Sequence, residues 1–333
     1  MVKIDKELSV RLSNLTLFAT LLILLMHLPS AGVSFKLPSC IDITHLAVPL
    51  FFMISGYLVA AKADEDCWYR VLIKKRIKTL VIPYFALNTL LLPIVFVYHN
   101  VLNLGGRLSF DWDAIVRIYG LSYKYHPACG VLWYVRCLFF FMLLSWVLVK
   151  IVRRSCAWGL VFCCFGMVMV SFFEASDLYK KNWTFFYSFF NVNGLLCFIV
   201  GMVLTMFSIE KRSIRQIAGL CLLIIGYSLR FVLGCPCLYP SGNLLMVLSL
   251  WMLMPSVRLP KWLLSSCFTI YVFHSLVYDL WKYAMGRCEV LEWVSNVFQF
   301  APFFVALGIC CALTYVVRNY CPRVGVVLFG GRC

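Results

Sequence analysis

The chain is organised by long apolar runs that alternate with short charged or turn-rich breaks. Ten of these runs approach the length needed to cross the hydrocarbon core of a bilayer, which takes about 20 helical residues. They fall at residues 12–28, 43–61, 79–98, 131–149, 156–173, 187–208, 214–233, 243–257, 262–281 and 297–317. The pattern predicts an all-α membrane protein, a polytopic bundle of about ten transmembrane helices.

The first run, LSNLTLFATLLILLMHLP (Leu12 to Pro29), carries one ionisable side chain, His27, near its far end. Basic residues precede it, as in a signal peptide, but the run is long for such a segment and no clear cleavage site of small residues follows. We therefore expect it to remain as a helix. An ionisable group inside a membrane costs about 3 kcal/mol, so His27 either hydrogen-bonds in the bundle interior or has a chemical role.

Composition agrees with a membrane protein. Of the 333 residues, 63% are hydrophobic and only 13% are charged, and no segment is able to build a soluble core of its own. Residues 1–333 are therefore expected to form a single integral-membrane domain. The formal charge of +16 does not indicate a nucleic-acid partner. The basic residues lie in short loops between the apolar runs, which is the distribution that the positive-inside rule describes for membrane proteins.

The basic residues also predict an orientation. With the N-terminus in the cytoplasm, 20 Lys and Arg residues fall on the cytoplasmic side and eight on the other. Ten helices with both termini cytoplasmic satisfy the positive-inside rule. Arg136 and Arg230 remain, at the outward ends of the fourth and seventh runs, where an arginine either extends to the membrane interface or has a function.

The 17 cysteines do not form a recognisable framework. Most lie inside apolar runs, where cysteine acts as a small hydrophobic residue, and no spacing with histidine is typical of zinc, so no metal is expected. Cys235 and Cys237 lie in a short loop, and this pair would oxidise if the loop is outside the cytoplasm.

Two loops carry candidate binding residues. The longest outer loop, His99 to Gly130, mixes aromatic and polar residues, which suits either a lid that contacts a glycan or an amphipathic interfacial helix. The inner loop Lys62 to Thr79 ends in a basic cluster directly before the third run. The cluster either sets topology and attracts anionic lipid, or binds a phosphorylated cytosolic cofactor such as coenzyme A. Its members are Lys74, Lys75, Arg76 and Lys78.

A series of motifs in a fixed order resembles a known family. After the helix that ends near His27 come VPLFFMISGYLVAAK (Val48 to Lys62) and KKRIKTLVIPYFALN (Lys74 to Asn88). Later stretches are LWYVRCLFFF (Leu132 to Phe141), FIVGMVL (Phe198 to Leu204) and SCFTIYVFHSLV (Ser266 to Val277). Together they are similar to the integral-membrane acyltransferase-3 family, typified by bacterial O-acetyltransferases of cell-envelope glycans.

One position departs from that resemblance. The family usually has an arginine eleven residues before the histidine of its first helix, and counting back from His27 leads to Thr16. Arg11 lies more than a helical turn further toward the cytoplasm, so it is a poor substitute. The departure leaves open whether donor contacts or activity differ in this chain.

The resemblance implies an O-acyltransferase in the bacterial cytoplasmic membrane. The expected donor is acyl-coenzyme A, most simply acetyl-CoA, bound at the basic cluster. The expected acceptor is a hydroxyl of an envelope polysaccharide, an oligosaccharide or a lipid-linked sugar. Acyl transfer needs a base for the hydroxyl proton and stabilisation of a tetrahedral oxyanion, and a neutral imidazole suits the first task.

His27 is the candidate base. His274 is expected to pair with His27, to bind acceptor, or to form part of the cavity wall, with hydrogen-bonded packing as the alternative to a direct role. Trp133 and Arg136 are further candidates for the cavity lining. Ser55, which precedes Gly56, suits helix packing, with a nucleophilic role as the alternative.

Two other classes of function remain open from the sequence. A transporter or flippase for a glycan or a small solute would also have many helices, intramembrane histidines and prolines such as Pro83 and Pro93 that interrupt apolar runs. A structural assembly factor would not need His27. Saturable binding of coenzyme A at the basic cluster separates an acyltransferase from a transporter, and loss of function when His27 is replaced separates it from an assembly factor.

Overall fold

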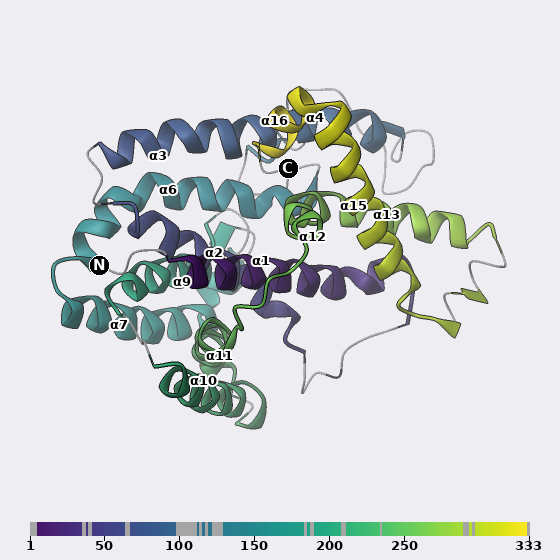
Figure 1. Cartoon of the computed structure of the whole chain (residues 1–333). Coiled ribbons are helices and arrows are strands. Elements are labelled where there is room, and N and C mark those ends of the chain that lie inside the picture. Colours follow the sequence, from purple (N-terminus) through teal and green to yellow (C-terminus); the bar gives the residue numbers. More distant parts are fainter. Residues whose placement is uncertain are drawn as a thin grey trace.

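The computed structural model describes residues 5–34, 38, 42–63, 67–97, 112, 115–116, 119–121, 129–182, 185–186, 190–207, 211–233, 235–288, 293–294 and 297–331. Within these residues every regular element is a helix (Figure 1). In the same part of the chain, seven helical segments are long and apolar enough to cross a membrane, and two further apolar ones, Thr44–Ala60 and Val192–Met206, are shorter. The expected fold class, an all-α membrane protein, is thereby confirmed.

Each of the ten apolar runs contains a helix. In chain order these are α1 (Lys6–His27), α2 (Ala47–Ala60), α4 (Ile82–Phe96), α6 (Trp133–Val152), α7 (Cys156–Ala175), α9 (Val192–Val203), α10 (Arg212–Tyr227), α11 (Tyr239–Leu253), α13 (Cys267–Met285) and α15 (Ala301–Tyr320). Shorter helices are α3 (Trp68–Arg76), α8 (Asp177–Lys181), α12 (Lys261–Ser265) and α16 (Pro322–Phe329). Two π-helical turns, η4 (Ile77–Val81) and η9 (Ser228–Val232), join α3 to α4 and extend α10. Turns of 3₁₀ helix are η1 (Leu28–Ala31), η3 (Thr44–Leu46), η6 (Gly130–Leu132), η8 (Leu204–Met206) and η10 (Pro236–Leu238).

Several helical segments begin earlier than their apolar runs, and two of them show why. The helix α1 starts at Lys6 because the Asp5 carboxylate accepts a hydrogen bond from the Leu8 amide at 2.7 Å, which caps the first turn. The third segment starts at Trp68, so the basic cluster is helical rather than part of a loop. Lysine and arginine are good helix formers, and a hydropathy run underestimates a helix that begins with them.

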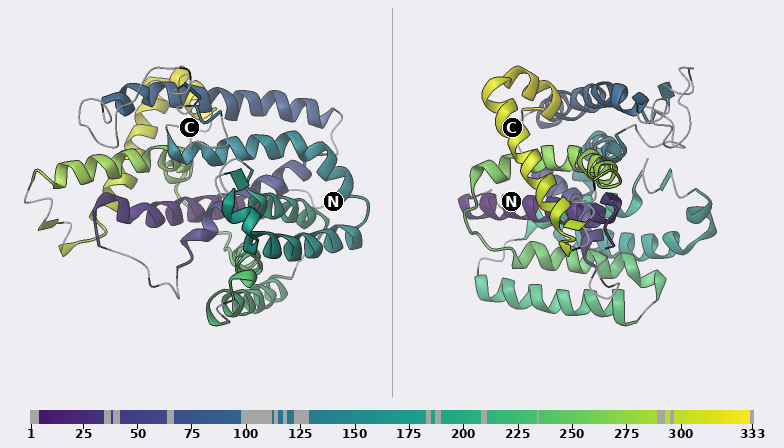
Figure 2. Two further views of the ribbon diagram at one scale, coloured as in Figure 1. Left: turned by 180° about the vertical axis from the view of Figure 1, so that it is seen from behind. Right: turned by 90° about the vertical axis from the view of Figure 1, so that its right-hand side faces the viewer.

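The helix α1 lies at the centre of the bundle. Figures 1 and 2 show it in the middle layer, with α3, α4 and α6 on one side and the α10–α11 hairpin on the other. It packs against both α2 and α13, and most of its apolar residues are buried. The first apolar run is therefore an interior element, and its far end delivers His27 to the neighbouring α13.

Helices α2 and α9 pack closely, and glycine permits the approach. A Cβ placed on Gly56 of α2 would overlap the carbonyl oxygen of Phe198, and one on Gly201 of α9 would overlap the carbonyl oxygen of Met53. Small residues allow helix backbones to come this near in membranes. The FFMISGY and FIVGMVL stretches are thus two halves of one packing seam.

Candidate functional site

The structure brings His27 and His274 together. His27 lies in the last turn of α1, and His274 lies in the middle of α13. Their ring centroids are 5.0 Å apart with the ring planes inclined at 43°. The crossing of the two helices is fixed nearby by Tyr278, whose hydroxyl donates to the Leu24 carbonyl at 3.0 Å. Of the residues that the sequence singles out, these two form the only pair of ionisable groups in ring contact within the described residues.

The hydrogen bonds of His274 fix its tautomer. Its Nδ1 lies 3.1 Å from the Ile270 carbonyl oxygen and 2.9 Å from the Tyr271 carbonyl oxygen. Because a carbonyl can only accept, Nδ1 must carry the proton, and in the neutral ring Nε2 then has a free lone pair. Nε2 is buried and has no hydrogen-bond partner, and the residue as a whole is 0% exposed. The backbone of α13 therefore holds a basic nitrogen ready to accept a proton from a neighbour.

His27 has a different environment. It is half-buried, it ends α1, and the chain continues directly into η1. The C-terminal end of a helix carries a partial negative charge, which would stabilise an imidazolium at His27 and is absent at His274 in the middle of its helix. The carbonyl of His27 accepts a hydrogen bond from the Ser30 hydroxyl at 2.6 Å, which closes the turn and leaves the ring free to face α13. His27 is thus the member of the pair better suited to carry a positive charge.

Aromatic rings connect this pair to the interior end of the basic cluster. Tyr271, one turn before His274, lies 5.9 Å from the Tyr134 ring and 6.4 Å from the Phe51 ring. Tyr134 in turn lies near Arg76. Neither tyrosine is distinctive in the sequence, because both look like ordinary membrane-interface aromatics. Tyr271 lies three residues before His274, one helical turn away, and this spacing could have marked it as a neighbour of the histidine.

The basic cluster divides into two faces. Lys74, Lys75 and Lys78 are exposed, whereas Arg76 is half-buried, and its buried Nε has no hydrogen-bond partner. Successive helical residues are about 100° apart, so Arg76 lies nearly opposite Lys74 and Lys78 around the helix axis. The four residues were expected to act as one patch, and the structure instead separates three surface lysines from one arginine that points inward.

Trp133 and Arg136 lie on the first turn of α6. Trp133 packs against the main hydrophobic core. Arg136 donates to the Gly120 carbonyl and to the Tyr84 hydroxyl, and Tyr84 donates to the Tyr119 carbonyl at 2.6 Å. These bonds connect α6 to α4 and to residues 119–121, so Arg136 anchors neighbouring segments.

Within the described part of the chain, neither Ser55 nor Thr16 is hydrogen-bonded to a base that would activate its hydroxyl as a nucleophile. Ser55 is half-buried on α2 and makes no hydrogen bond among the described residues, next to the Gly56 packing contact. The Thr16 hydroxyl donates to the Leu12 carbonyl at 2.8 Å, one turn back on its own helix. The position at which the resemblance leads one to expect an arginine therefore holds a short side chain bonded to α1 itself.

Arg11 does not take the place of the missing arginine. It is buried, and its Nε and one terminal nitrogen donate to the Met254 and Trp251 carbonyl oxygens at 3.1 and 2.5 Å. These carbonyls end α11, where backbone oxygens lack helical partners. Arg11 thus caps α11, on a different flank of α1 from His274.

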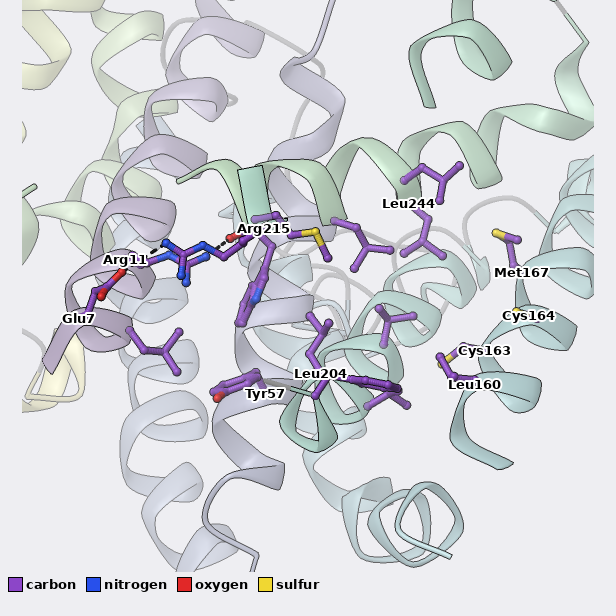
Figure 3. A pocket seen from close by; sticks show the side chains of 18 of the residues that line it. Glu7, Arg11, Tyr57, Leu160, Cys163, Cys164, Met167, Leu204, Arg215 and Leu244 are labelled. Atoms are coloured by element: carbon purple, nitrogen blue, oxygen red, sulfur yellow. Dashed lines mark hydrogen bonds and ion pairs between the residues drawn. The ribbon is translucent and has the colours of Figure 1, made fainter. Parts of the chain in front are cut away.

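A cavity of about 740 Å³ lies on that other flank (Figure 3). Its wall includes Arg11 and Tyr57, but neither His27 nor His274. Among the described residues, no three His, Cys, Asp or Glu side chains gather as metal ligands would.

Other expected features lie apart from the histidine pair. His45 is bonded through Nε2 to the Asn243 side-chain oxygen at 2.8 Å. Arg230 stacks over the Tyr239 ring at 4.0 Å. Most of the long loop, including His99 and His126, falls outside the described residues, so the choice between a lid and an interfacial helix stays a prediction. Cys235 and Cys237 are free thiols whose sulfur atoms are 2.9 Å apart.

Comparison with known proteins places the chain in a family. No curated protein and no solved structure matches it significantly. A family model described as an acyltransferase domain matches residues 12–316, nearly the whole chain, from the first turns of α1 to the last turns of α15. The matched region contains the histidine pair, the aromatic rings and the basic cluster. The chain therefore belongs to the acyltransferase-3 family of membrane acyltransferases.

Proposed function

We propose that this membrane acyltransferase moves an acyl group, most simply acetyl, from cytosolic acyl-coenzyme A to a hydroxyl on a glycan. The acceptor is a cell-surface polysaccharide, an oligosaccharide or a lipid-linked precursor, and the membrane is the bacterial cytoplasmic membrane. Membership of the acyltransferase-3 family supports acyl transfer as the reaction. The finer assignment is supported by the chemistry of the histidine pair and by the position of the basic cluster.

The observation that carries the proposal is the contact between His27 and a His274 whose tautomer is fixed. His27 removes the proton from the acceptor hydroxyl as the oxygen attacks the thioester carbonyl. His274 offers its Nε2 lone pair to the imidazolium that forms, which orients and stabilises that ring as a carboxylate does in a catalytic triad. When the tetrahedral intermediate collapses, the C–S bond breaks and His27 returns the proton to the leaving thiolate.

The basic cluster suits the donor. The exposed Lys74, Lys75 and Lys78 present positive charge to a phosphorylated ligand at the membrane surface, and such contacts are long-range and sensitive to salt. Arg76 lies inward of them and near Tyr134, whose ring is 5.9 Å from the Tyr271 ring. The backbone carbonyl of Tyr271 accepts the hydrogen bond from His274 Nδ1. A donor with its phosphates on the lysines would extend its thioester arm along these aromatic rings.

The same proposal includes ten membrane crossings with both termini cytoplasmic. The helix found in every apolar run supports the number, and the excess of basic residues in alternate loops supports the orientation. The donor then approaches the end of the bundle near the basic cluster, and the acceptor approaches the end at which α1 places His27.

The test is a transfer assay on the full chain in nanodiscs, with acetyl-coenzyme A and crude envelope glycan. The wild type is compared with His27→Ala and with His45→Asn, which alters a histidine bonded elsewhere. Turnover that is lost in the first variant and kept in the second supports the proposal. Turnover that survives His27→Ala removes His27 as the base. The absence of coenzyme A binding in all three proteins, with solute uptake into vesicles, would replace the proposal by transport.

A further inference from the structure

The cavity of about 740 Å³ is separate from the proposed reaction site. It is lined by residues of α1, α2, α7, α9, α10 and α11, and its volume is within the range of about 300–1,000 Å³ typical of small-molecule sites. In Figure 1 the α10–α11 hairpin is seen nearly end-on while α1 and α6 run across the view, so the hairpin crosses the bundle at a steep angle. At one end the hairpin meets α7, where the Ser171 and Ser241 hydroxyls are 3.1 Å apart. Helices that cross in this way diverge toward the other end, where the cavity lies.

The long wall of the cavity is apolar. Leu160, Cys163, Cys164 and Met167 come from α7, and Leu244 and Leu248 are among those from α11. Leu160 and Cys164 are also exposed, so the cavity communicates with the surroundings of α7. The outward face of this helix carries exposed residues such as Val161, at 58%, and Phe165, at 62%, which would face lipid tails. An occupant that enters here comes from the bilayer and presents an apolar chain.

The other end of the cavity carries charges of both signs. Asp5, Glu7, Arg11 and Arg215 line it, and an Arg215 terminal nitrogen lies 3.3 Å from a Glu7 carboxylate oxygen. Figure 3 shows Glu7, Arg11 and Arg215 together, with Cys163, Cys164 and Met167 at the opposite end. The buried Nε of Arg215 has no hydrogen-bond partner, and within the described residues Arg11 forms no bond through its second terminal nitrogen. The site can thus still donate hydrogen bonds to an anion.

We propose that this cavity binds one phospholipid whose headgroup joins a phosphate to a primary ammonium. One acyl chain lies along α7 and α11, the phosphate accepts from Arg215 and Arg11, and the ammonium donates to Glu7 and Asp5. A purely anionic headgroup would leave the two carboxylates without a cationic partner and would add a net negative charge to a site whose two arginines and two carboxylates already balance. A quaternary ammonium has no N–H to donate, so it would lose the hydrogen bonds to those carboxylates. The lipid fills the gap left by the crossing of the hairpin.

The test measures lipid retention and does not depend on acyl transfer. The purified full chain is stripped of lipid and mixed with equimolar phosphatidylethanolamine, phosphatidylcholine and phosphatidylglycerol, and the bound species are counted by native mass spectrometry. We expect one phosphatidylethanolamine per chain, retained about tenfold over the other two, which corresponds to about 1.4 kcal/mol. A phosphatidylethanolamine with a photoreactive acyl chain should label the peptide that contains residues 160–167.

Three variants and one matched control locate the site. Arg215→Gln removes the phosphate contact, while Leu248→Trp and Cys164→Trp fill the cavity from opposite walls. Each should lower retention about tenfold while the thermal unfolding transition remains cooperative. Arg212→Gln alters an exposed arginine on the same helix that does not line the cavity, and should retain lipid as the wild type does.

Three results would overturn the proposal. Equal retention of the three lipids would mean ordinary annular contact, and preference for phosphatidylglycerol would refute the headgroup assignment. Displacement of the photoprobe by acetyl-coenzyme A would make the cavity part of the donor site.

Discussion

His27 and His274 are in ring contact but are bonded in opposite ways. His274 uses Nδ1 to donate to its own helix and is fully buried, whereas His27 is half-buried at a helix end. Only one nitrogen of His274 is therefore left for chemistry, and its surroundings disfavour a charge on that ring. In the proposed mechanism, this asymmetry is the reason that His27 takes the proton and His274 positions His27.

Replacement of the two histidines should have different effects. His27→Ala removes the base, and we expect turnover to fall by about 10² to 10⁴, the usual contribution of a positioned base. His274→Asn keeps an amide that can donate to the Ile270 and Tyr271 carbonyls but has no nitrogen in place of Nε2. It should lower kcat by about 10 to 100 and displace the acidic limb of the rate–pH profile, while KM changes little. A loss of kcat with an unmoved pH profile would reduce His274 to a packing residue.

The two faces of the basic cluster should separate in steady-state kinetics. Lys75→Gln removes one exposed charge and should raise KM for acetyl-coenzyme A by about two- to fivefold at low salt, with kcat unchanged, and added salt should diminish the effect. Arg76→Gln alters the inward-facing member and should lower kcat as well, because Arg76 lies near Tyr134. Initial rates at two salt concentrations make the comparison. If Lys75→Gln and Arg76→Gln both raise KM equally and leave kcat unchanged, Arg76 acts as one more member of the surface patch.

The positions of the long helices could be predicted from the sequence, because an apolar run that crosses a membrane must satisfy its own backbone hydrogen bonds and therefore forms a helix. It misplaced the starts of α1 and α3, where a cap at Asp5 and a helical basic segment extend the helix beyond the apolar residues. The helical period would have separated Arg76 from Lys74 and Lys78.

The contact between His27 and His274 could not be predicted from local sequence patterns. It depends on which helices cross, and the sequence left pairing as one of several roles for His274. The anchoring role of Arg136 and the capping role of Arg11 depend on carbonyl oxygens of distant segments, which have no signature in the sequence.

The glycine seam between α2 and α9 should be intolerant of any side chain. Gly201→Ala would place a methyl group against the Met53 carbonyl, so the helices must separate or the protein must unfold. We expect a loss of at least about 2 kcal/mol in unfolding free energy and low yields of folded protein. Gly308→Ala is the matched control, because Gly308 is also helical but has no atom within 4 Å of its added Cβ. Thermal unfolding in detergent measures both, and equal transitions would show that the seam is loose.

Arg11 should matter for stability through the end of α11. Arg11→Met leaves the Trp251 and Met254 carbonyls without their donor in a buried setting, which should cost about 2–4 kcal/mol. Arg11→Lys should recover part of this, since one ammonium can reach one of the two carbonyls but not both in the same geometry. Arg258→Met, at an exposed arginine, is the control for loss of charge. An unfolding temperature in Arg11→Met equal to that of Arg258→Met would contradict the capping role.

Cys235 should be the more reactive thiol of its pair. Its sulfur is hydrogen-bonded to that of Cys237, and this bond lowers the pKa of the Cys235 thiol. A lowered pKa means a larger thiolate fraction at neutral pH and faster alkylation. Iodoacetamide at pH 7 should therefore label Cys235 before Cys237, as read by peptide mass spectrometry. Cys237→Ala removes the hydrogen bond and should slow labelling of Cys235 at pH 7 by a few-fold, with the difference closing as the pH rises and both proteins become fully ionised. A labelling rate that is unchanged in Cys237→Ala, or a wild type already oxidised and unreactive until reduced, would contradict the assignment of a free, activated thiol.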